Sequence, residues 1–239
     1  MICYYREDVL NMLEKAIENI NTFYTEKCLN YRGKCKDRKE DYEDIATAFV
    51  LDKLKQFENI NLVNRQQSYK MPDHEELIPD SEKIDELKKG EIQRKEEWLA
   101  KSMYDKIYEN LGKIIDFQVS IKAVCDDTAG KIDLLAYAEK ENVLYVLELK
   151  KSDSKETLLR CIMEIYTYYK QINGDKLLKD YSLSEDCTIV PAVLIYKETP
   201  AADKVSSSLS QKLIKALGVS VFMITEAEKG VLPTRIEKA

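Results

Sequence analysis

The sequence predicts an α/β fold in which a mixed central sheet is flanked by helices. The 239 residues are 44% hydrophobic and 33% charged, which are the values of a globular chain. Seven glycines and five prolines are too few for the many turns of an all-β sandwich. Apolar residues also recur at helical spacing early in the chain and form continuous, strand-like runs later. Together these observations favour helices around a limited sheet.

The first part of the chain is predicted to be helical. Amphipathic patterns over residues 5–29 and 40–57 predict two helices, and a strongly polar stretch over 64–96 opens as a loop and closes as a helix start. Around residue 97 the pattern changes to a helix that is followed by strand-like runs. We therefore divide the chain into a helical N-terminal region, residues 1–90, and an α/β domain, residues 91–239.

The elements of the second part follow from their periodicity and their stop signals. A helix is expected from 97 to Leu111 with Gly112 as its end, and Asp203 and Gly218 bound a later one. The full predicted order is helix 97–111, strands 114–124, 131–138 and 143–150, helix 155–172, strand 188–196, helix 203–217 and strand 219–225. Short connections predict antiparallel pairing of the first three strands, and helical crossovers predict parallel pairing of the later ones.

Charge and cysteine usage exclude several classes of protein. A net charge of −6 disfavours a protein that coats nucleic acid by bulk charge, although it allows a local basic cleft. There is no apolar run of about 18 residues, so no membrane span is expected, and the first ten residues lack the apolar segment of a secretory signal. Six cysteines without a C-x-x-C spacing are typical of free thiols, which predicts a cytoplasmic protein.

Two carboxylates interrupt otherwise apolar strands. Asp133 lies in GKIDLLAYA and Glu148 in VLYVLELKK. If residues 139–142 form the connection, the simplest register pairs Ala138 with Val143 and also places Asp133 opposite Glu148 on one face. Lys150 shares that face because side chains alternate along a strand.

Two opposed like charges in a sheet repel each other, and a divalent cation between them would reverse the sign of that interaction. Carboxylates and a backbone carbonyl are ligands that Mg²⁺ accepts. Two carboxylates, a metal and a lysine together form a site for phosphodiester hydrolysis. The competing interpretation is an ordinary ion pair of Asp133 with Lys150 or Lys131 at a sheet edge.

These residues resemble a known signature. Asp133, fourteen residues and then Glu148-Leu149-Lys150 are similar to the D…(D/E)-x-K motif of the PD-(D/E)XK nuclease superfamily, although Ile132 replaces the proline of the name. The predicted element order over about 93–196 is similar to the αβββαβ core of that superfamily. The resemblance implies a restriction-endonuclease-like fold.

The resemblance also implies roles for these residues. Asp133 and Glu148 would be metal ligands together with the carbonyl of Leu149, and Mg²⁺, or Mn²⁺ in its place, would be the cofactor. Lys150 would orient or activate the attacking water and stabilise charge in the transition state.

Many members of the superfamily add an acid from the first core helix. Glu97 in EEWLAKSMY has the Glu-x-x-Ala spacing, and Glu43 in YEDIATAFV is its rival. Some members also carry Gln-x-x-x-Tyr after the E-x-K strand. Here Glu164 and Tyr168 stand at that place, so glutamate replaces the glutamine.

The function implied is a Mg²⁺-dependent nuclease that hydrolyses phosphodiester bonds, with DNA favoured over RNA as partner and no membrane. The N-terminal region would contribute substrate selection, homodimer formation or a partner surface. The alternative is a catalytically silent module of the same fold that binds nucleic acid or a protein.

Overall fold

The computed structural model describes residues 4–71, 74–77, 79–89, 93–123 and 130–239. Its α-helices are α1 (Arg6–Ala16), α2 (Tyr42–Asp52), α3 (Leu54–Phe57), α4 (Ser81–Lys89), α5 (Lys95–Met103), α6 (Leu158–Gln171), α7 (Gly174–Asp180), α8 (Pro200–Lys204) and α9 (Ser208–Leu217). The 3-10 helices are η1 (Ile17–Thr25), η2 (Lys27–Asn30) and η3 (His74–Leu77). The strands are β1 (Ile107–Tyr108), β2 (Gly112–Ser120), β3 (Lys131–Ala138), β4 (Val143–Leu149), β5 (Thr188–Tyr196), β6 (Ser220–Glu228) and β7 (Leu232–Lys238).

The strands form one mixed, seven-stranded sheet in the order β1-β2-β3-β4-β5-β6-β7. The pairs from β1 to β4 are antiparallel, the β4–β5 and β5–β6 pairs are parallel, and β7 is antiparallel to β6. The short connections therefore join antiparallel strands and the helical crossovers join parallel ones, as the sequence predicts. The sheet curls until its ends approach, and the Asn110 side-chain amide donates to the Ile236 carbonyl at 2.9 Å.

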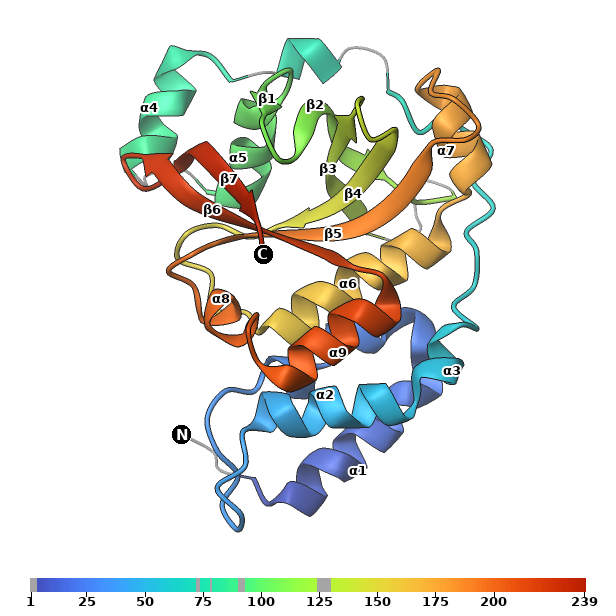
Figure 1. Ribbon diagram of the computed structural model, residues 1–239, viewed down its shortest axis with the longest axis vertical. Coiled ribbons are helices and arrows are strands. Elements are labelled where there is room, and N and C mark those ends of the chain that lie inside the picture. Colours follow the sequence, from blue (N-terminus) through green and yellow to red (C-terminus); the bar gives the residue numbers. More distant parts are fainter. Residues whose placement is uncertain (1–3, 72–73, 78, 90–92, 124–129) are drawn as a thin grey trace.

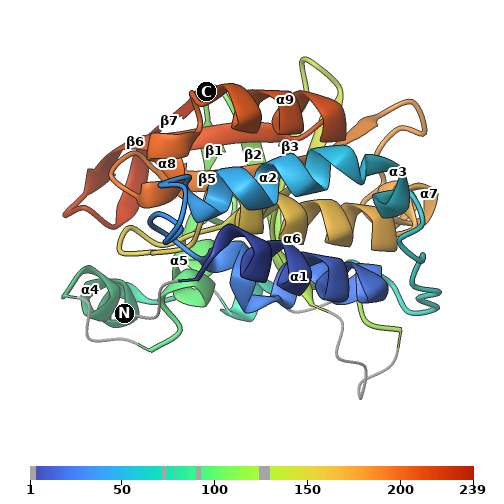
Figure 2. The ribbon, with the colours of Figure 1, turned by 90° about the horizontal axis from the view of Figure 1, so that it is seen from below.

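Each face of the sheet is covered by a different set of helices (Figures 1 and 2). The α6 and α9 helices lie on one face, and α1, α2 and η1 pack outside them. The hydrophobic core on this face runs without interruption from Val9 in α1 to Val221 in β6. The α4 and α5 helices cover the other face, where Leu87 and Leu99 contribute to a second core. Residues 1–90 thus contribute to both faces.

The helix expected from residue 97 to Leu111 is shorter than predicted. It begins at Lys95 and ends at Met103, and the chain then turns through Asp105, which has a left-handed φ of 61°. Residues 107–108 pair with the start of β2 instead. Leu111 is buried, but in the β1–β2 hairpin rather than in a helix. The prediction of a helix here is wrong because a tertiary strand pairing overrides a weak local preference.

Other elements also differ from the prediction. The helix expected over 5–29 is α-helical only to Ala16 and continues as the 3-10 helices η1 and η2. The helix expected over 203–217 is broken into α8 and α9, and Ser207, rather than Asp203, caps α9 by accepting from the Ser210 N–H at 3.1 Å. The strand β7 was not predicted at all. It is an edge strand whose Pro233 and polar residues weaken the strand pattern, and proline is tolerated at an edge because one side of the strand needs no ladder bonds.

Four of the six cysteines are described, namely Cys28, Cys35, Cys161 and Cys187, and all four are buried free thiols. Cys3, Cys125 and the end of the predicted 114–124 strand at Val124 lie outside the described residues. Among the helices of the described ranges, none combines the length and apolar character that a bilayer crossing requires.

Candidate active site

The β3–β4 hairpin places the two strand carboxylates on one face of the sheet. Its register pairs Ala138 with Val143 and continues to Leu134 with Leu147, as the sequence predicts. The next step of the same register sets Asp133 opposite Glu148. Asp133 lies two residues from Leu135, and Glu148 two residues from Val146, so each points to the same face as its neighbour. Leu135 and Val146 belong to the core beneath α6. The two carboxylates therefore lie side by side under α6.

Asp133 is held by neutral hydrogen-bond donors. Its Oδ2 accepts from the backbone N–H of Leu149 at 2.9 Å, and its Oδ1 accepts from the Gln118 side-chain amide at 2.8 Å. Among the described residues it forms no ion pair with Lys150 or Lys131, so the simple ion-pair interpretation of Asp133 does not hold. The bond to Leu149 fixes the carboxylate against the end of β4.

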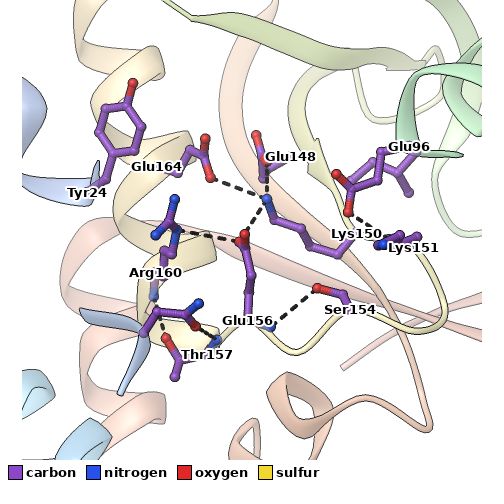
Figure 3. A network of polar contacts seen from close by, with 12 residues as sticks. Tyr24, Glu96, Glu148, Lys150, Lys151, Ser154, Glu156, Thr157, Arg160 and Glu164 are labelled. Carbon is purple, nitrogen blue, oxygen red and sulfur yellow. Dashed lines mark hydrogen bonds and ion pairs between the residues drawn. The ribbon is translucent and has the colours of Figure 1, made fainter. Parts of the chain in front are cut away.

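Lys150 is the centre of an acidic cluster, which Figure 3 shows from close by. Its ammonium Nζ lies 2.6 Å from Glu148 Oε1, 3.0 Å from Glu156 Oε2 and 3.3 Å from Glu164 Oε2. The Glu148 and Lys150 side chains are almost fully buried, with 5% and 6% exposed. One buried cation thus binds three carboxylates. We name Asp133, Glu148, Lys150, Glu156 and Glu164 the carboxylate–lysine cluster.

The α6 helix and the residue before its cap present a row of polar side chains to the cluster. Glu156, Arg160, Glu164 and Tyr168 follow one another at intervals of four, so they share one side of the helix. Arg160 Nε lies 3.6 Å from Glu156, and the Tyr168 hydroxyl donates to Glu164 Oε1 at 3.1 Å. The helix begins where Thr157 accepts from the Arg160 N–H at 3.2 Å. This cap fixes the row relative to β4.

Burial and crowding oppose ionisation of the strand carboxyls. Burial raises the pKa of Asp133 to about 7, against the lowering effects of Lys150 and the Leu149 N–H. Burial also raises the pKa of Glu148, and Asp133 and Glu164 add to the effect. Burial alone would lower the pKa of Lys150, but Glu148 and Glu164 outweigh it and raise that pKa. Lys150 is therefore charged throughout the ordinary pH range.

The α5 acid that approaches the cluster is Glu96 and not Glu97, which the sequence predicted. Glu97 Oε1 accepts from Lys101 at 2.8 Å and its other oxygen lies 3.5 Å from Arg94, and these cations lower its pKa. Its neighbour Glu96 instead accepts from the Lys151 N–H at 3.2 Å and raises the pKa of Asp133. The α5 acid nearer to the cluster is thus Glu96.

Its rival, Glu43, has a different position. Its buried carboxylate in α2 accepts from the Leu159 N–H at 3.0 Å, within the first turn of α6. Burial raises its pKa, which the α6 amides partly oppose. Glu43 thus holds α2 against the positive end of α6, and among the described residues it forms no hydrogen bond or ion pair with Asp133 or Glu148.

Sequence reasoning assigned nothing to Glu156, Arg160 or Gln118. Glu156 and Arg160 precede Glu164 at intervals of four, and side chains at this spacing lie on one side of a helix. The spacing could therefore have indicated that they lie near Glu164. Glu156 precedes the helix, however, and its approach to Lys150 depends on the turn after β4. Gln118 has a left-handed φ of 50° in a strand, which no sequence pattern indicates.

Gly130 supports the cluster from the start of β3, and its replacement provides a test. A β-carbon at Gly130 would overlap the ring and hydroxyl of Tyr168, the partner of Glu164. We expect Gly130→Ala to lower the free energy of unfolding by about 1–3 kcal/mol, as overpacked sites do. Urea denaturation measures this.

The matched control is Gly174→Ala, because a β-carbon there meets only the flexible Ile189 Cδ1 at 3.1 Å. We expect it to change stability by less than roughly 1 kcal/mol. Equal stabilities of the two variants would show that Tyr168 is not held as described.

The cluster offers the oxygen donors that a hard divalent cation takes. Four carboxyls, from Asp133, Glu148, Glu156 and Glu164, meet two cations, Lys150 and Arg160. This imbalance fits an additional positive ion. As arranged, no group of three or more His, Cys, Asp or Glu side chains within the described ranges is placed to hold a metal, because Lys150 occupies the centre.

The chain matches no protein-family model, no curated protein and no solved structure.

Proposed function

We propose that the protein is a Mg²⁺-dependent nuclease of the restriction-endonuclease-like type that hydrolyses phosphodiester bonds in DNA. The observation that carries the proposal is the placement of Asp133 and Glu148 on one face of a hairpin, with Lys150 two residues later on the same face. Apart from the two-residue β1 and the short α7, the order α5-β2-β3-β4-α6-β5 is similar to the αβββαβ core of that fold.

The proposed chemistry assigns a role to each residue. Asp133, Glu148 and the Leu149 carbonyl would hold Mg²⁺, which when bound supplies positive charge for the reacting phosphate and lowers the pKa of a bound water. Lys150, which is charged at all relevant pH values, would orient the attacking water and stabilise negative charge. Glu164 and its partner Tyr168 would position Lys150.

A cleavage panel tests this proposal. Single-stranded, double-stranded and branched DNA and the matching RNAs would be incubated with Mn²⁺ or Mg²⁺, with EDTA as the blank. We expect metal-dependent cleavage of at least one DNA substrate, and its loss in Asp133→Asn. An absence of cleavage across the panel with both metals would contradict the proposal.

One observation favours the silent module as a second candidate. The ammonium of Lys150 is bound by three carboxylates and both oxygens of Asp133 have donors, so the cluster is internally paired without a metal. Calorimetric titration with Mn²⁺ separates the two candidates. A nuclease binds the ion through Asp133 and Glu148, whereas a silent module gives the same titration for wild type and Asp133→Asn.

A further inference from the structure

A small pocket rich in lysine lies beside the end of β4, on the side of the sheet covered by α5. Its volume is about 160 Å³. Lys88 and Lys89 reach it from α4, Lys95 from α5 and Lys151 from the segment after β4. The rest of the lining comes from Leu87, Leu99, Tyr196 and Val231 and from Ser152 and Asp153, which follow Lys151. We name it the lysine pocket.

The lysine pocket carries an excess of positive charge. Among its described lining residues the one carboxylate is Asp153, which lies 3.4 Å from Lys95 Nζ and 3.3 Å from Lys151 Nζ. Lys88 is paired at 2.9 Å with Glu228, which does not line the pocket. Counted with Asp153 and Glu228, the four lysines of the lining leave an excess of two positive charges, which favours a compact anion.

The pocket and the carboxylate–lysine cluster lie on the two sides of one stretch of chain. Lys151 lines the pocket, whereas the preceding Lys150 binds the cluster. The same alternation occurs on α5, where Lys95 lines the pocket and Glu96 accepts from the Lys151 N–H. Figure 3 shows Glu96 and Lys151 bonded to each other next to Lys150. An anion in the pocket would therefore lie close to the proposed reaction site.

We propose that the lysine pocket binds a phosphate group of the nucleic-acid strand, outside the phosphodiester that is cleaved. This inference rests on the proposed function for the identity of the polymer, but phosphate binding itself does not. Lysine ammonium groups bind phosphate as point charges, and such contacts position a strand without reading its sequence. The pocket would thus set where along the strand Asp133 and Glu148 act.

Inorganic phosphate provides a test that is independent of cleavage. Binding would be measured in EDTA by ³¹P line broadening and by the melting temperature in phosphate against chloride at equal ionic strength. We expect Lys95→Gln/Lys151→Gln to raise the apparent Kd for phosphate by at least about tenfold. The control, Lys212→Gln/Lys215→Gln, removes two exposed lysines of α9 and should match wild type. Equal phosphate binding by the two double variants would overturn the proposal.

Duplexes with different ends identify the source of the phosphate. Binding in EDTA to duplexes ending in a 5′-phosphate, a 3′-phosphate or hydroxyls would be compared. If the pocket takes a terminal phosphate, the Lys95→Gln/Lys151→Gln variant loses affinity about tenfold for one phosphorylated end alone. If it takes an internal phosphodiester, affinity falls for all three. Unchanged affinity for all three relative to the α9 control would contradict the proposal. Failure of the cleavage panel would leave the phosphate results intact, so the two proposals are tested separately.

Discussion

The Asp133→Asn variant is expected to fold more stably than wild type at pH 8 without metal, and to lose metal-dependent cleavage more than roughly 100-fold. Burial raises the pKa of Asp133 to about 7 in the folded protein, far above the usual value of about 4 in an unfolded chain. The folded state therefore binds more protons. This carboxyl favours folding below about pH 4, and that contribution is lost as the pH rises towards 7.

Asparagine retains the contacts of Asp133 without the charge. Its carbonyl can accept from the Leu149 N–H, and the Gln118 amide can rotate so that its oxygen accepts from the new NH₂ group. We expect a gain of roughly 1–4 kcal/mol at pH 8 and almost none at pH 4, because one pKa unit corresponds to about 1.4 kcal/mol. Urea denaturation at the two pH values measures the difference.

Metal shifts the difference in stability towards wild type. Mg²⁺ at 100 times its Kd would stabilise wild type by about 2.7 kcal/mol and leave Asp133→Asn unchanged. The matched control is Asp52→Asn, whose carboxylate is 77% exposed and should respond to Mg²⁺ like wild type. If Asp133→Asn retained cleavage, Asp133 would not be a metal ligand.

The hairpin that carries the site could be predicted because its determinants are local. A four-residue connection over 139–142, with Asn142 at a φ of 52°, joins two strands whose apolar residues must remain in the core. A register slip of one residue would move every apolar side chain to the wrong face. The positions of Asp133 and Glu148 follow from that constraint, with no information from the rest of the chain.

The partners of these residues could not be predicted in the same way. Whether Glu96 or Glu97 approaches Asp133 depends on the rotation of α5 about its axis, which packing against β2 and α4 determines. The approach of Glu156 to Lys150 depends on the turn between β4 and α6. That turn is held by long-range bonds from Thr157 to Leu29 and Asn30. Such contacts between segments more than 100 residues apart leave no local pattern.

The Lys150→Ala variant is expected to be strongly destabilised as well as inactive, so loss of cleavage in it is not a clean measure of chemistry. Removal of the ammonium leaves Glu148, Glu156 and Glu164 without their common cation. Breaking a buried ion pair in this way typically costs about 3–5 kcal/mol. The loss of unfolding free energy relative to wild type should grow from pH 5 to pH 8. Burial raises the pKa of Glu148, so without its cation this carboxyl favours folding only while it is protonated, whereas Lys150, with its raised pKa, stays charged in wild type.

Removing the surrounding charges separates the structural role of Lys150 from its chemical role. A triple variant, Lys150→Met with Glu156→Gln and Glu164→Gln, replaces Lys150 and two of its three carboxylate partners by neutral groups of similar size and leaves Glu148 in place. Replacing buried ion pairs in this way is often neutral or stabilising. We expect it to recover part of the unfolding free energy lost in Lys150→Ala, measured in urea at pH 8, and to remain inactive in the cleavage panel. Recovery of cleavage together with stability would show that the lysine has no part in the reaction. Since Asp133 and Glu148 are unchanged in this variant, binding of Mn²⁺ should persist, which assigns the loss of cleavage to the ammonium rather than to the metal.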